Sequence, residues 1–338
     1  MYCDGRFLVF LCTRADTSIV ATTNNDGKKG TMFMDYVMET KNLTKQYKSV
    51  TVVDHVNLHV PEGKIYGLLG RNGAGKTTVM KMMLQLVHPT KGTVRLFDTD
   101  YKENMDMLYR NIGSIIETPG FYNNLTGQEN LQLLARLRGQ ISKDAVRNAL
   151  EIVGLDKEKK KVFADYSLGM KQRLGIAAAI MNEPKLLILD EPINGLDPIG
   201  ISEIRQFLCE LKDKKGITIF ISSHVLSEIE QMADIIGVMN EGRLVEEVHM
   251  EELHKRRRKY MEFSLSDGKA ASKILEERCQ ITDYTLDGNV VRIYDHSGEP
   301  GELNKIFVEN GLMVTKIIES EENLEEYFSK LIGGGGIA

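Results

Sequence analysis

A glycine-rich segment at residues 70–77, GRNGAGKT, holds the residue types best suited to chemistry. It follows an apolar segment that predicts a strand, residues 65–69, and precedes one that predicts a helix, residues 77–87. Glycines let backbone N–H groups turn inward around phosphate oxygens, and a helix N-terminus favours negative charge. Lys76 would reach the β and γ phosphates of a nucleotide, and Thr77 would ligate Mg²⁺. The residues expected to bind the nucleotide here are Gly70, Asn72, Gly73, Ala74, Gly75, Lys76, Thr77 and Thr78.

A second apolar segment, residues 186–189, ends in two adjacent carboxylates, Asp190 and Glu191. Asp190 is suited to holding Mg²⁺, and Glu191 to orienting and polarising an attacking water as a general base. On its own, this pattern is often only a strand that enters a turn. The phosphate-binding segment earlier in the chain favours the catalytic interpretation.

The elements that must position these residues alternate between strands and helices over residues 36–245, which is typical of an α/β nucleotide-binding domain. The apolar strand candidates are residues 65–69, 186–190, 217–222 and 235–240, and the longest helical candidates between them are residues 77–87, 126–138 and 142–153.

The chain changes character after about residue 250, where a basic segment, residues 255–259, begins a different pattern. This segment would be either a solvated linker or, less simply, a contact for anionic lipid. Asp287-Gly288 is a hairpin signal. We therefore predict a small accessory α+β domain at residues 250–332 and a flexible tail at 333–338. Its expected elements are a strand at 260–265, a helix at 268–277, two strands around the hairpin, another helix, and a strand at 312–318.

The first 35 residues show no hydrophobic periodicity and are polar, with many Asn and Gly residues. Residues 1–35 are therefore predicted to be disordered or to result from a start site placed too far upstream. Met32, Met34 and Met38 are alternative starts, and the codons for residues 28–30 would be purine-rich, as a ribosome-binding site is.

The bulk composition of the 338 residues is that of an ordinary globular protein of about two domains, with 42% hydrophobic and 27% charged residues. The net charge of −5 argues against nucleic acid as a partner. Four scattered cysteines indicate free thiols in a reducing cytosol. No apolar run approaches the roughly 18–20 residues that a membrane-spanning helix needs, so any transport path would belong to another chain.

A third element, SLGMKQR at residues 167–173, precedes the Asp-Glu strand. With it, residues 36–245 resemble the ABC transporter ATPases, in which this signature loop completes the ATP site of the opposite subunit. The resemblance implies a homodimer in which Ser167 supplies a hydroxyl and Gly169 permits close backbone approach to the phosphate. Leu168 and Met170 depart from that family's common SGGQ form.

Other positions match the family in order and spacing. Residues 194–198 resemble its D-loop at the dimer seam, and His224, at the end of a strand, matches its switch histidine, which contacts the γ-phosphate. Tyr47 matches the aromatic residue that stacks on adenine. Glu117 stands where the family usually has Gln, and would offer an oxygen to Mg²⁺. A Glu here resembles the subgroup that exports bacitracin, lantibiotics and related peptide antibiotics.

The resemblance implies an ABC-type P-loop NTPase fold, with a helical signature subdomain and the accessory domain. It also implies an ATP hydrolase, bound peripherally at the cytoplasmic side of the cell membrane, that powers peptide-antibiotic export through a separate permease. The catalytic residues would be Lys76, Glu191 and His224, and the metal ligands Thr77, Glu117 and Asp190. A short permease helix is expected beside residues 112–118 and 126–138.

Three alternatives stay open. One is an exporter or importer of small solutes. Another is a soluble ABC ATPase outside transport, against which the single P-loop and the lack of a long heptad repeat weigh. The third is a regulator that binds ATP without hydrolysing it, against which the presence of both Glu191 and His224 weighs.

Overall fold

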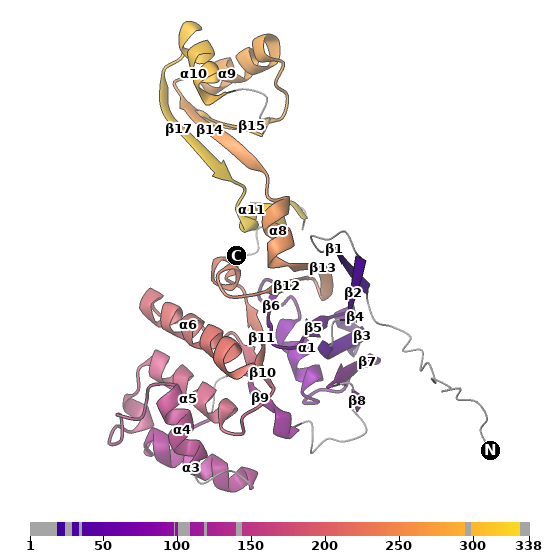
Figure 1. Ribbon diagram of the computed structural model, residues 1–338, viewed down its shortest axis with the longest axis vertical. Coiled ribbons are helices and arrows are strands. Elements are labelled where there is room, and N and C mark those ends of the chain that lie inside the picture. The colour runs from indigo at the N-terminus through magenta and orange to yellow at the C-terminus, as the bar shows by residue number, and fades with distance from the viewer. Residues whose placement is uncertain are drawn as a thin grey trace, which may run out of the picture.

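The computed structural model describes residues 19–23, 29–33, 36–97, 99–100, 109–117, 120–139, 144–294 and 299–331. A larger unit carries most helices, and a smaller one with α9 and α10 lies at the end of the molecule away from α3, α4 and α5 (Figure 1). No helix in these ranges has the length and apolarity needed to cross a membrane.

The larger unit is built on a six-stranded sheet with the order β13-β12-β6-β11-β10-β9. All neighbouring strands are parallel except β13 and β12. In this register Asp190 pairs with Ser222 and Ser223 pairs with Leu69, so the carboxyl ends of β6, β10 and β11 meet at one edge. Ligands bind at such an edge in open α/β sheets. The strands are β6 (Ile65–Leu69), β9 (Ile112–Ile115), β10 (Leu186–Asp190), β11 (Thr218–Ser223), β12 (Ile235–Asn240) and β13 (Arg243–His249).

An antiparallel sheet packs beside it, which the sequence analysis did not identify. Its order is β4-β3-β7-β8, and β5 pairs with β3. The helix α1 (Lys76–Met83) shares one hydrophobic cluster with both sheets, through residues such as Met80, Val53 and Phe220. The strands are β3 (Tyr36–Tyr47), β4 (Val50–Val56), β5 (His59–Pro61), β7 (Lys91–Leu96) and β8 (Thr99–Asp100).

The helices α3 (Gly127–Arg138), α4 (Ala145–Ile152) and α5 (Leu168–Ile180) gather on one side of the larger unit (Figure 1). Thr126 and Glu129 form a capping box at the start of α3, which satisfies N–H groups that the helix leaves free. Ser167 caps α5 by accepting a hydrogen bond from the Met170 N–H at 3.3 Å. The predicted helices at 126–138 and 142–153 are confirmed, with later starts. The larger unit also holds α6 (Pro198–Lys215) and α7 (Leu226–Glu230).

The smaller unit is a four-stranded antiparallel sheet, β15-β16-β14-β17, with its own hydrophobic cluster around Phe263 and Phe307. The predicted order of strands and helices is confirmed, including the hairpin at Asp287-Gly288. The elements are β14 (Lys259–Leu265), α9 (Gly268–Ile274), β15 (Tyr284–Asp287), β16 (Val290–Ile293), α10 (Pro300–Glu309) and β17 (Val314–Glu321).

The boundary between the units differs from the predicted one. Strand β13 continues the large sheet to His249, beyond the expected end at 245. Two helices inside the predicted accessory domain, α8 (Met250–Arg256) and α11 (Leu324–Leu331), place Leu253 and Phe328 in the hydrophobic cluster of the larger unit. Within each helix the buried apolar residues lie three or four positions apart, Met250 with Leu253 and Leu324 with Phe328. In α8 the adjacent basic segment obscured that pattern.

The basic segment at residues 255–259 is a charge-paired junction. Four of its side chains meet carboxylates: Arg256 pairs with Glu246 and Glu252, Arg257 with Glu230, Arg258 with Asp283, and Lys259 with Glu321. Because these charges are neutralised within the chain, the lipid-contact alternative loses its support.

At the N-terminal end, β1 (Ile19–Thr23) and β2 (Lys29–Phe33) pair antiparallel, where the sequence predicts no regular structure. Residues 19–23, IVATT, are rich in β-branched types, which favour strands. The rest of the predicted disordered segment, and the predicted tail at 333–338, lie outside the described residues.

Candidate functional site

The turn between β6 and α1 forms a cradle that only glycine permits at two positions. Gly75 has φ 104°, and a Cβ there would lie 2.9 Å from the Val52 carbonyl oxygen. A Cβ on Gly70 would lie 2.5 Å from the Met239 carbonyl oxygen. Because α1 begins at Lys76, its free N–H groups face this turn, as an anion site requires.

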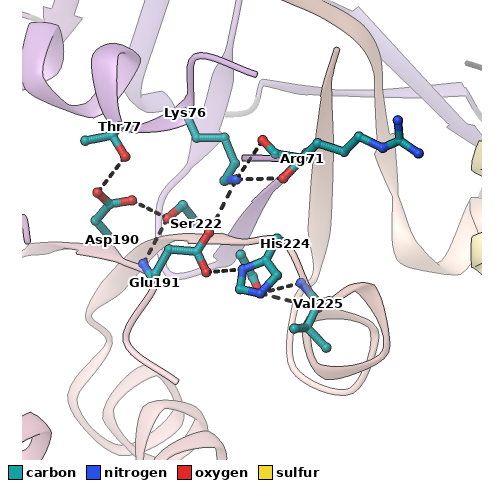
Figure 2. A network of polar contacts seen from close by, with 10 residues as sticks. Arg71, Lys76, Thr77, Asp190, Glu191, Ser222, His224 and Val225 are labelled. Atoms are coloured by element: carbon teal, nitrogen blue, oxygen red, sulfur yellow. Dashed lines mark hydrogen bonds and ion pairs between the residues drawn. The ribbon is translucent and has the colours of Figure 1, made fainter. Parts of the chain in front are cut away.

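Lys76 points back over the cradle (Figure 2). Its side chain is buried, and its Nζ donates to the carbonyl oxygens of Gly70 at 2.6 Å and Arg71 at 3.3 Å. The same ammonium lies 3.3 Å from Glu191 Oε1. The structure thus joins the predicted lysine and the predicted general base, which are far apart in the sequence.

Asp190 collects hydroxyl groups from two elements. Thr77 Oγ1 donates to Asp190 Oδ2 at 2.7 Å, and Ser222 Oγ donates to Asp190 Oδ1 at 2.6 Å (Figure 2). Ser222 Oγ also accepts a hydrogen bond from the Glu191 N–H at 3.0 Å. Ser222 was not predicted as a site residue, because its place opposite Asp190 depends on the register of β10 and β11.

This oxygen cluster fits Mg²⁺, which usually takes one or two protein carboxylates together with phosphate oxygens and water. Asp190 supplies the carboxylate and Thr77 the hydroxyl. No group of three or more His, Cys, Asp or Glu side chains suited to a metal occurs within the described ranges. One carboxylate and one hydroxyl suit an ion whose other ligands come from phosphate and water.

Glu191 is held between two partners. Its Oε2 lies 2.7 Å from His224 Nδ1, while its Oε1 faces Lys76 (Figure 2). Its backbone has φ 48°, a left-handed conformation that costs energy in a non-glycine residue and is common at functional sites. Glu191 and His224, each predicted as a catalytic residue, therefore lie at one site in the fold.

Glu117, predicted as a metal ligand, contacts Lys81. Its Oε1 accepts a hydrogen bond from Lys81 Nζ at 2.6 Å, with no hydrogen bond to Thr77 or Asp190. This bond raises the pKa of Lys81, an effect that burial of the ammonium opposes, and the negative charges of Glu117 and Asp190 raise that pKa further. The same bond lowers the pKa of Glu117. Lys81 was also missed, although it lies one helical turn after Thr77.

Tyr47 ends β3 and is about half exposed. Lys45 Nζ lies over the ring, 4.9 Å from its centroid. The other residues predicted to contact the nucleotide differ in exposure. Asn72 and Gly73 are exposed, Thr78 is half-buried and Ala74 is buried.

Ser167 and Gly169 line a different hollow, of about 500 Å³, together with the predicted D-loop residues Gly195, Leu196 and Asp197. No residue of the phosphate cradle lines it. Within one chain, the signature loop is therefore apart from the cradle.

Known proteins resemble this chain over most of its length. A family model described as ABC transporter matches residues 53–194. The chain is 72% identical over 307 residues to the bacitracin transport ATP-binding protein BcrA of Enterococcus faecalis, covering 91% of this chain and 100% of that protein. It is 53% identical over 306 residues to the protein of the same name from Bacillus licheniformis, covering 90% and 100%.

Among solved structures, it matches the dimeric structure of a bacterial ABC transporter cassette, with a TM-score of 0.55 and 26% identity, over 63% of this chain and 98% of that one. This likeness confirms the predicted fold class. The predicted resemblance to ATPases of peptide-antibiotic transport is confirmed by the relatives. Since 72% identity extends over the whole of one of these relatives, the chain belongs to the ATP-binding proteins of the ABC transporter family.

Proposed function

We propose that this chain hydrolyses ATP to power the export of bacitracin or a related peptide antibiotic through a separate membrane permease. The observation that carries the enzymatic part is the Glu191 carboxylate, held between Lys76 and His224 at the edge of the sheet. The names of the two relatives, both bacitracin transport ATP-binding proteins, support the cargo.

The chain's own residues suit phosphoryl transfer, in which catalysis is mostly positioning and charge stabilisation. The cradle N–H groups and Lys76 would bind the β and γ phosphates once the ammonium leaves the Gly70 carbonyl. Glu191 would orient the attacking water and accept its proton, while His224 holds the carboxylate. Mg²⁺, held by Thr77 and Asp190, would neutralise phosphate charge when bound.

A second copy of the chain would complete each site. Within one chain the signature loop lies apart from the cradle, so Ser167 and Gly169 would contact the nucleotide of a partner subunit. Two large apolar side chains at this hollow are exposed, Leu168 at 47% and Ile199 at 70%. Cover by a partner subunit would remove this apolar surface from water.

ATP binding and hydrolysis by this dimer would drive conformational changes in the permease. We place its short helix beside Glu117 and the start of α3, where the side chain of Tyr122 is exposed. This arrangement would hold the ATPase at the cytoplasmic side of the membrane without a span of its own.

Replacing Glu191 with glutamine tests the proposal. The purified E191Q variant should bind Mg-ATP but release phosphate at least about a hundredfold more slowly, because the general base is lost. A strain that carries E191Q in place of the native gene should become sensitive to bacitracin. The matched control is E210Q, which changes an exposed glutamate on α6 that pairs with Lys214.

Two results would contradict the proposal. Near-normal phosphate release by E191Q would reject Glu191 as the base. Loss of phosphate release without any change in bacitracin sensitivity would agree with the proposed ATPase activity but would reject bacitracin as the cargo.

A further inference from the structure

Glu117 combines an exposed side chain with an uncommon backbone conformation. Its φ is 64°, in the left-handed region that a non-glycine residue seldom adopts, and 67% of its side chain is exposed. Such strain persists only where neighbouring contacts hold it. The side-chain contact that the structure shows here is the hydrogen bond from Lys81 Nζ, at 2.6 Å.

Lys81 connects Glu117 to the candidate metal site. It follows Thr77 by four residues on α1, so both side chains lie on one face of the helix. Its charge also interacts with the carboxylate of Asp190, which accepts the hydrogen bond from Thr77. Lys81 therefore ties Glu117, by a hydrogen bond, to the helix face that presents Thr77 to the candidate metal site.

We propose that Lys81 is a positioning residue that holds the Glu117 carboxylate, and that a divalent cation at Thr77 and Asp190 competes with Lys81 for it. A bound cation attracts the carboxylate, which has the opposite charge, and repels the ammonium, which has the same charge. Lys81 thus weakens the affinity for the metal until the nucleotide-bound cation draws Glu117 away. This inference rests on the proposed function, since it requires a site for a metal-bound nucleotide.

The test is a double-mutant cycle on the full-length protein. Binding of Mn²⁺ is measured by electron paramagnetic resonance in the presence of a non-hydrolysable ATP analogue. We expect K81M to bind Mn²⁺ about two- to fivefold more tightly, the range for release of a carboxylate from an exposed ion pair. K81R should behave as the native protein does. K214M, which removes an exposed lysine paired with Glu210, should cause no shift.

In an E117Q background the same K81M change should tighten Mn²⁺ binding by less, because only the repulsion between the ammonium and the cation is then relieved. A K81M variant with unchanged or weaker Mn²⁺ binding would overturn the inference, and so would a shift of the same size in the E117Q background. Failure of the native protein to bind the nucleotide analogue would instead reject the proposed function. Normal analogue binding without the expected cycle would reject only the role of Lys81.

Discussion

Replacing Ser222 with alanine removes the hydroxyl that joins the two carboxylate residues. Ser222 is fully buried, donates to Asp190 Oδ1 at 2.6 Å and accepts from the Glu191 N–H at 3.0 Å. A hydrogen bond to a charged group contributes about 1.5–3 kcal/mol, and a buried donor left without a partner costs about 1–3 kcal/mol. Because Asp190 is only partly buried, we expect S222A to lower the free energy of unfolding by about 2–4 kcal/mol.

The same change should slow ATP hydrolysis by about tenfold or more, since Glu191 loses the contact that holds its strained backbone. Guanidinium chloride unfolding, followed by circular dichroism, measures the stability, and phosphate release measures the rate. The matched control is S223A. Ser223 is equally buried, but its Oγ accepts from the Val225 N–H at 2.9 Å and contacts neither carboxylate.

S223A should cost about 1 kcal/mol, the usual value for a neutral hydrogen bond, and leave the rate near normal. Equal losses of stability and rate in S222A and S223A would refute the reasoning. They would mean that the Ser222 hydroxyl contributes no more than any buried hydroxyl at the end of β11.

Two further predictions concern contacts outside the site. The pKa of His59 is raised above its ordinary 6.5, mainly by its hydrogen bond with Glu247. Burial of the ring opposes this rise, and the negative charges of Glu247 and Glu39 add to it. Because the folded protein binds this proton more tightly than the unfolded chain does, protonated His59 stabilises the fold. This stabilisation should be complete below pH 6.5 and be lost as the pH rises through the raised pKa of His59. The thermal midpoint, measured from about pH 6 to about pH 9, should fall more steeply in the native protein than in H59Q, and a parallel fall would contradict this. Phe328 is fully buried in the hydrophobic cluster of the larger unit, so F328A should lower the free energy of unfolding by about 3–5 kcal/mol. The control V308A, at an exposed position, should lower it by under about 0.5 kcal/mol. Hydrogen exchange should then increase in α7 and α11; an increase confined to β14–β17 would show that α11 belongs to the smaller unit.

Several features of this protein follow from short stretches of sequence. The strands at 65–69 and 186–190 were predicted with the bounds the structure shows, because both are unbroken apolar runs buried on both faces of a parallel sheet. The glycines of the cradle were predicted from the motif alone, although the carbonyl groups that exclude a Cβ at Gly70 and Gly75 belong to Met239 and Val52, far along the chain. The hairpin at Asp287-Gly288 was predicted from its turn residues alone.

The fold also brought together predicted residues that the sequence keeps apart. Lys76, Glu191 and His224 meet at one edge because parallel strands align their carboxyl ends there. The sequence predicted their roles from residue type and order, but not that Glu191 would touch both partners.

Contacts between distant segments could not be predicted from the sequence, because hydrophobic periodicity and turn residues report only on near neighbours along the chain. Ser222 meets Asp190 across 32 positions, and Lys81 meets Glu117 across 36. Likewise, the pattern of α8 and α11 shows an apolar face but not which cluster buries it. The sequence alone determined the phosphate cradle, the strand ends and the family. Only the tertiary structure decided which side chains hold the carboxylates, because that depends on strand register and packing.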